Sequence, residues 1–157
     1  MYGELNNQEI DEVLHGETLG RIGYESDGKI FIVPIAYAYD GNNVYVYSAD
    51  GHKVHAMHKN PQVAFEVEEV KGLSEWRSVH AHGRFEILRS EEADHAHGLL
   101  SKRISTALAD ERPGAAVDLF LGSAMPPAVG DQSGESLVNG QVYRIALYDR
   151  VGRFEKK

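Results

Sequence analysis

Hydrophobic residues near the start of the chain recur at helical spacing. Ile10, Val13 and Leu14 lie three or four positions apart, which places them on one side of a helix. Asn7 can cap the first turn, and Gly16 is suited to ending the helix. We therefore expect a short amphipathic N-terminal helix.

From Thr18 onward the pattern changes to the alternation that is typical of β-strands. Polar turns at Ser26-Asp27-Gly28 and Asp40-Gly41 separate alternating segments and favour hairpins. In residues 44–47 the two valines face one side and the two tyrosines the other. The segments expected as strands are 19–24, 29–39, 44–47, 63 to a turn at 71–72, 76–88 and 141–148.

Two further stretches have helical spacing. His52 to Lys59 ends before Asn60-Pro61, because the residue before a proline is pushed out of the helical region. Ser90 to Ala109 carries a stripe of alanine, leucine and isoleucine. Six hairpin-linked strands with peripheral helices predict a mainly β fold, a small closed or partly closed antiparallel barrel.

The chain gives no sign of a domain boundary. We expect residues 1–157 to form a single domain, with the N-terminal helix inside 1–16. Residues 111–135 have no sustained period and are expected to form a long loop, which either covers a site or is merely mobile.

Composition narrows the function classes. The 157 residues are 42% hydrophobic and 25% charged, with 16 Lys and Arg against 24 Asp and Glu, so the net charge is −8. An acidic chain is a poor partner for nucleic acid or an acidic membrane surface. No segment resembles a signal peptide or a membrane span, and the absence of cysteine excludes disulfides and thiolate chemistry. We expect a cytoplasmic protein.

The first chemical candidate is the segment Ser48-Ala49-Asp50-Gly51-His52-Lys53. It ends a strand, turns at a glycine and opens a helix. The amide groups of a helix N-terminus, a serine hydroxyl and a lysine ammonium together suit a phosphate-sized anion. The alternative is a solvated turn with a surface lysine.

A second candidate is the segment Val33-Pro34-Ile35-Ala36-Tyr37. Its proline lies inside a strand pattern and removes a hydrogen-bond donor from the sheet. Such a position indicates an edge strand or a place where a flat ligand meets the backbone. An edge proline that prevents aggregation is an equally good explanation.

These segments resemble the FMN-binding split barrels, the family that includes pyridoxamine 5′-phosphate oxidase and the nitroimidazole reductase proteins. The likeness extends from about Leu19 to Leu88, and residues 142–153 show a weaker similarity. The motifs that carry it are 33–37, Ser48-Ala49 with Gly51-His52-Lys53, Asn60-Pro61-Gln62-Val63 with Phe65, and Trp76-Arg77-Ser78-Val79 with Gly83.

The resemblance implies a six-stranded antiparallel split barrel that binds FMN, and it assigns roles to residues. The backbone of Val33, Pro34, Ile35, Ala36 and Tyr37 would border the isoalloxazine ring. Ser48 and Lys53 would bind the phosphate, and Trp76, Arg77 and Ser78 would approach the flavin across the interface of a homodimer.

The nitroimidazole reductase branch matches better than the vitamin B6 oxidase branch, whose basic substrate-binding tail is not evident. His52 matches the histidine that lies by the active site in the former branch. The implied activity is an FMN-dependent oxidoreductase with a small-molecule substrate, in which His52 or Arg77 donates a hydrogen bond near the flavin. The alternative is a non-catalytic flavin- or haem-binding protein that stores, senses or delivers its cofactor.

The remaining polar clusters are the histidines and a run of glutamates, and solvent exposure is the simpler explanation for both. His52, His55 and His58 are spaced by three, and His80 and His82 share a strand face, so both sets have acceptable metal-ligand spacing. Without a placed carboxylate, solvated histidines are preferred and no metal is expected. The run Glu66, Glu68 and Glu69 is expected to be solvated rather than catalytic.

Overall fold

The structure, a computed structural model, describes residues 1–49, 51–109 and 140–157. Its elements are β1 Tyr2–Glu4, α1 Asn7–Gly16, β2 Leu19–Ser26, β3 Lys29–Ala36, β4 Ala38–Tyr39, β5 Asn43–Ala49, α2 His52–Lys59, β6 Gln62–Gly72, β7 Glu75–Ile87, α3 Ser90–Ala109 and β8 Gly140–Glu155. The prediction of a mainly β chain with peripheral helices is confirmed. The loop expected over 111–135 lies outside the described residues.

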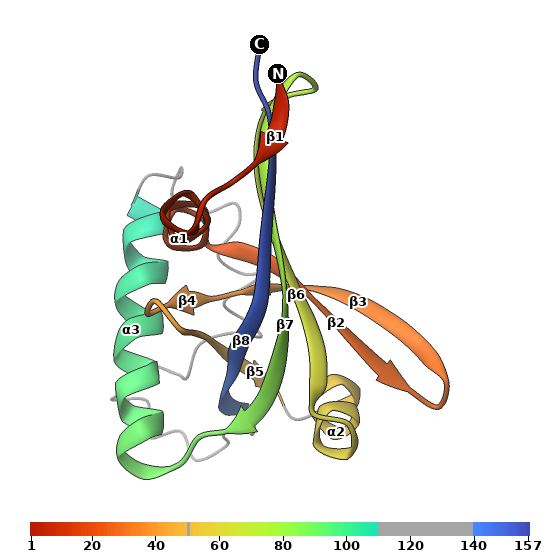
Figure 1. Ribbon diagram of the computed structural model, residues 1–157. Helices are drawn as coiled ribbons and strands as arrows, with labels where there is room; N and C mark the ends of the chain where they lie inside the picture. Colours follow the sequence, from red (N-terminus) through yellow and green to blue (C-terminus); the bar gives the residue numbers. More distant parts are fainter. Residues whose placement is uncertain (50, 110–139) are drawn as a thin grey trace.

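One antiparallel sheet carries all the described strands. Its order is β3-β2-β6-β7-β8-β5-β4, and β1 pairs with β8 beside this path. Among the described residues no ladder joins the two end strands, β3 and β4. The antiparallel sheet is therefore not closed, as expected of a split barrel (Figure 1).

The described residues form eight strands where six were expected. Residues 29–39 do not form one strand, because the chain leaves β2 at Tyr37, whose amide donates to the Thr18 carbonyl. Residues Ala38–Tyr39 then pair with β5 as the separate strand β4. The other addition is β1, which pairs with the end of β8.

The last strand is longer than the predicted 141–148. A bulge, in which two residues of β8 oppose one of β7, lies between the pairs Tyr148–His82 and Val151–His80. Asp149, inside the bulge, has a φ of 51°, a conformation that short polar side chains tolerate. The strand continues past it to Glu155 and joins the expected C-terminal tail to the sheet. Likewise, β6 runs through Gly72, so its turn with β7 falls after 71–72.

The hydrophobic core has two parts, one on each face of β5. Val44 and Val46 pack with α1, α2 and the inner faces of the barrel strands. Tyr45 and Tyr47 pack on the opposite face against α3. The predicted alternation is confirmed, and both faces are buried because α3 covers the outer one (Figure 1).

The helices attach through the apolar stripes that the sequence predicted. α1 buries Ile10, Val13 and Leu14. Its cap is Asn6 and not Asn7: the Glu9 amide donates to the Asn6 side chain, and the Asn6 amide donates to the Glu9 carboxylate. This reciprocal pair makes Asn6 the better cap. No helix in the described ranges is long and apolar enough to cross a membrane.

Candidate functional site

The start of α2 is an open helix terminus. Its N-cap residue is Gly51, in extended backbone conformation, which has no side chain with which to cap the first turn. The first amide groups of a helix have no partner within the helix. Together with the helix dipole, they favour an anion at this end.

Lys53 lies in this first turn and is partly buried. Burial lowers the pKa of its ammonium group. Within the described ranges, no hydrogen bond or ion pair holds this ammonium. The side chain of Ser48, which is near Lys53 in the sequence and lies at the end of β5, is buried. A partly buried cation without a counter-charge is destabilising, and a bound anion would remove that cost. The residues at this end of the molecule therefore fit a phosphate group.

His52 is the outermost member of an aromatic cluster. Tyr24 and Phe31 are cross-strand partners on β2 and β3 with stacked rings, centroids 5.4 Å apart. The Tyr24 hydroxyl lies 3.1 Å from His52 Nδ1, and the imidazole packs edge-on against Phe31, with centroids 5.1 Å apart. When Tyr24 donates to Nδ1, the proton of the neutral imidazole resides on Nε2. The exposed ring can then donate a hydrogen bond from Nε2.

The segment Val33–Tyr37 lies mostly on β3, the strand that ends the sheet. Among the described strands β3 pairs only with β2, and exposed Pro34 stands opposite Arg21. The prediction of an edge strand is confirmed. Ile35 and Tyr37 point into the core, and the contact of Phe31 with His52 brings this strand to the start of α2. That its backbone borders a flavin ring stays a prediction.

Trp76, Arg77 and Ser78 lie at the other end of the molecule. They pair with the ends of β6 and β8, whereas α2 precedes the start of β6. The nine residues from Gln62 to Val70 span roughly 26 Å of extended strand, measured between the first and last Cα. Figure 1 shows α2 at the lower end of β6 and β7 and their hairpin at the upper end, near both termini. A single chain therefore does not bring these three residues to Lys53.

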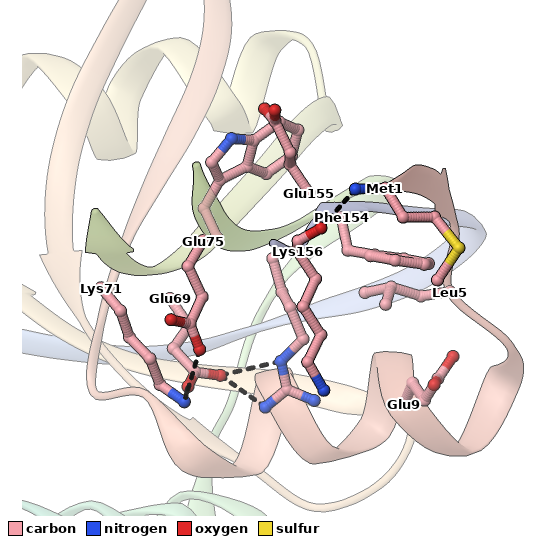
Figure 2. A pocket seen from close by; sticks show the side chains of 11 residues that line it. Met1, Leu5, Glu9, Glu69, Lys71, Glu75, Phe154, Glu155 and Lys156 are labelled. Carbon is pink, nitrogen blue, oxygen red and sulfur yellow. Dashed lines mark hydrogen bonds and ion pairs between the residues drawn. The ribbon is translucent and has the colours of Figure 1, made fainter. Parts of the chain in front are cut away.

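A pocket of about 500 Å³ lies at this hairpin end (Figure 2). Arg77 is held there by Glu69, with a 2.9 Å hydrogen bond from Nε, and by Glu12 at 3.3 Å. Lys71 lies 3.6 Å from Glu69 and 3.7 Å from Glu75. Trp76 packs edge-on against Tyr2. The full lining is Met1, Leu5, Glu9, Glu69, Lys71, Glu75, Trp76, Arg77, Phe154, Glu155 and Lys156.

Sequence reasoning missed the partners of these residues. Glu69 is not merely solvated, because its hydrogen bond to Arg77 is the main reason that the pKa of its carboxyl is lowered. Tyr24 and Phe31 were not singled out beside His52. Only the register of the hairpins places these side chains together, and alternation alone does not specify register.

The histidines form no multi-residue metal group. In the described part of the chain, no three or more His, Cys, Asp or Glu side chains are placed to hold a metal ion. His58 instead packs edge-on against Phe85, and His82 stacks on Tyr148.

Comparison with known proteins identifies the family. The model of the family described as pyridoxamine 5′-phosphate oxidase matches residues 6–123. The chain belongs to this family. The resemblance inferred from the motifs is thereby confirmed. An uncharacterised protein of Rhizobium meliloti is 33% identical over 104 residues, 63% of this chain and 69% of that protein.

Solved structures of this family share the fold. A structure described as an FAD-binding protein from Mesorhizobium loti is 27% identical, with a TM-score of 0.71 and 99% of both chains covered. A 5-nitroimidazole antibiotic resistance protein from Bacteroides thetaiotaomicron is 15% identical, with a TM-score of 0.67, and the match covers 98% of this chain and 87% of that one. At that identity the second likeness shows the fold alone.

Proposed function

We propose that this protein is an FMN-dependent oxidoreductase that reduces a small organic acceptor. The observation that carries the proposal is the partly buried ammonium of Lys53, which lies at an uncapped helix N-terminus and has no counter-charge in the described ranges. A phosphate group supplies that charge. The Mesorhizobium loti structure, described as FAD-binding, supports a flavin as the molecule that carries the phosphate.

In this proposal the predicted residues bind different parts of the flavin. Lys53, the first amides of α2 and the Ser48 hydroxyl hold the phosphate, and the backbone of Val33–Tyr37 borders the ring. The flavin, when bound, supplies the redox chemistry. His52 is the proposed catalytic residue, because its exposed ring can donate a hydrogen bond or a proton from Nε2 to a substrate. Arg77 is a weaker candidate, since Glu69 and Glu12 already engage its guanidinium.

The proposal includes a homodimer in which Trp76, Arg77 and Ser78 of one subunit approach the flavin held by the other. The separation of these residues from Lys53 within one chain supports a shared site. The β2–β3 hairpin has exposed apolar side chains that are available for the contact between subunits. Ile30 is 79% exposed and Ile32 is 69% exposed. Such surfaces favour association.

The test is an absorption spectrum of the purified protein, followed by titration with FMN, FAD and haem. Flavin bands, or saturable binding of FMN with a size that matches a dimer by light scattering, are expected. A Soret band would favour the non-catalytic haem-binding alternative. A protein that binds none of the three would contradict the proposal.

A further inference from the structure

Three polar side chains share one face where β5 ends and β8 begins. Ser48 stands directly opposite Gln141, and Tyr143 stands two residues further along β8, opposite Val46. Side chains two positions apart project from the same face of a strand, and diagonal neighbours across a strand pair lie within reach of each other. Val46 and Tyr143 belong to the main core, so this face points into the barrel.

Two of these groups have unused hydrogen-bonding capacity. The Tyr143 side chain is fully buried, yet neither its hydroxyl nor Gln141 Oε1 has a hydrogen-bond partner among the described residues. Burial raises the pKa of Tyr143, while the neighbouring Ser48 hydroxyl lowers it. The strand register makes Ser48 and Tyr143 diagonal neighbours, and their hydroxyls do not meet the geometry of a hydrogen bond. A buried hydroxyl left in this state reduces stability.

Ser48 connects this interior face to the open end of α2. Ser48 is a diagonal neighbour of Tyr143 across the strand pair, and along the chain it lies just before the end of β5 at Ala49 and the start of α2 at His52. A serine hydroxyl carries one proton and two acceptor lone pairs. It can therefore accept a hydrogen bond from one side and donate one to the other.

We propose that Tyr143 is a positioning residue of the phosphate site: its hydroxyl donates to Ser48 Oγ when the ligand binds and turns the Ser48 proton toward the phosphate. This inference deepens the proposed function and rests on it. The phosphate accepts hydrogen bonds only, so it needs the Ser48 proton. Without Tyr143, that proton is free to turn toward Gln141 Oε1, the unpaired acceptor across the strand pair.

The experiment compares FMN with riboflavin, which has the same ring and ribityl chain but no phosphate. Tyr143→Phe should lower the ratio of FMN affinity to riboflavin affinity by roughly fivefold, the scale of one hydrogen bond. Its thermal midpoint without ligand should stay the same or rise, because the hydroxyl removed has no partner. A purely structural role would lower the midpoint and leave the ratio unchanged.

Tyr39→Phe is the matched control. The Tyr39 side chain is also buried, but its hydroxyl donates to the Asp11 carboxylate at 2.8 Å, on the α1 side of the core. Its loss should lower the thermal midpoint and leave the FMN to riboflavin ratio at the wild-type value.

A second variant tests whether the effect of Tyr143 on phosphate binding acts through Ser48. Ser48→Ala should lower the same ratio by at least as much, and adding Tyr143→Phe to it should change the ratio no further. An unchanged ratio in Tyr143→Phe, or a full further loss in the Ser48→Ala background, would overturn the inference. Failure of the wild-type protein to bind either flavin would instead overturn the proposed function, and this inference with it.

Discussion

The positively charged side chains at the two ends of the β6–β7 pair have opposite surroundings. At the hairpin end, Arg77 and Lys71 each face carboxylates at ion-pair distance. At the α2 end, Lys53 is partly buried and lacks such a partner in the described ranges. Both ends carry cations, but among the described residues the charges of Arg77 and Lys71 are paired with carboxylates, whereas the partly buried charge of Lys53 is left for a ligand. The partners of a cation, more than its presence, distinguish a binding site from a structural ion pair.

The direction of the pKa shifts reflects this difference. The pKa of Glu69 is lowered chiefly by the hydrogen bond from Arg77, so this pair stabilises the folded chain. The pKa of Lys53 is lowered by burial, so its charged form is held at a cost. The binding of an anion at Lys53 would remove this cost.

The largest effect is expected for His52→Ala. We expect flavin to stay bound and turnover of a nitroaromatic or quinone acceptor to fall about 100-fold, the scale of a lost proton donor. The measurement is steady-state turnover under a chemical reductant at several pH values. His58→Ala, two turns further along α2, is the control and should retain activity. Equal turnover of the His52 variant and wild type would assign His52 to the surface.

Lys53→Met should weaken FMN binding by about 1.5–3 kcal/mol, the scale of a hydrogen bond to a charged group. Riboflavin binding should change little, because it lacks the phosphate. Titration calorimetry at low and high salt measures both. Lys71→Met, which removes a lysine that Glu69 and Glu75 already face, should leave both affinities unchanged. If it matched Lys53→Met, the contrast between the two ends would be wrong.

A smaller effect is expected at the hairpin end. Glu69→Gln should lower the free energy of unfolding by about 1 kcal/mol near neutral pH, the upper range for a partly exposed ion pair. Because the folded pKa of Glu69 is lowered, its contribution is present above the ordinary glutamate pKa and is lost as pH falls through the folded value. Urea unfolding should therefore show the wild type and variant converging in acid, and a constant difference would argue against the pair.

The sequence predicted much of the fold because periodicity is a local property. The alternation in β2, β5 and β7 and the apolar stripes of α1 and α3 could be read without tertiary contacts. The break at Tyr37 and the bulge at Asp149 could not, since both arise from pairing with distant strands. The choice between Asn6 and Asn7 as cap depended on one residue of register.

The candidate site was predictable only in part. Gly51 and Lys53 are two positions apart in the sequence, so a helix start with a lysine could be recognised directly. Tyr143 is about ninety residues away from Lys53, and no local pattern distinguishes its buried hydroxyl from those of other strand tyrosines. Contacts across a sheet depend on register, which the sequence specifies only through the whole fold.

A crystal structure of the protein with FMN tests the central claim most directly. We predict the phosphate within hydrogen-bond distance of Lys53 Nζ and the first amides of α2, with Trp76 of a second copy approaching the ring. A phosphate found beside Arg77 and Lys71 in the hairpin pocket, with the start of α2 left free, would contradict the account.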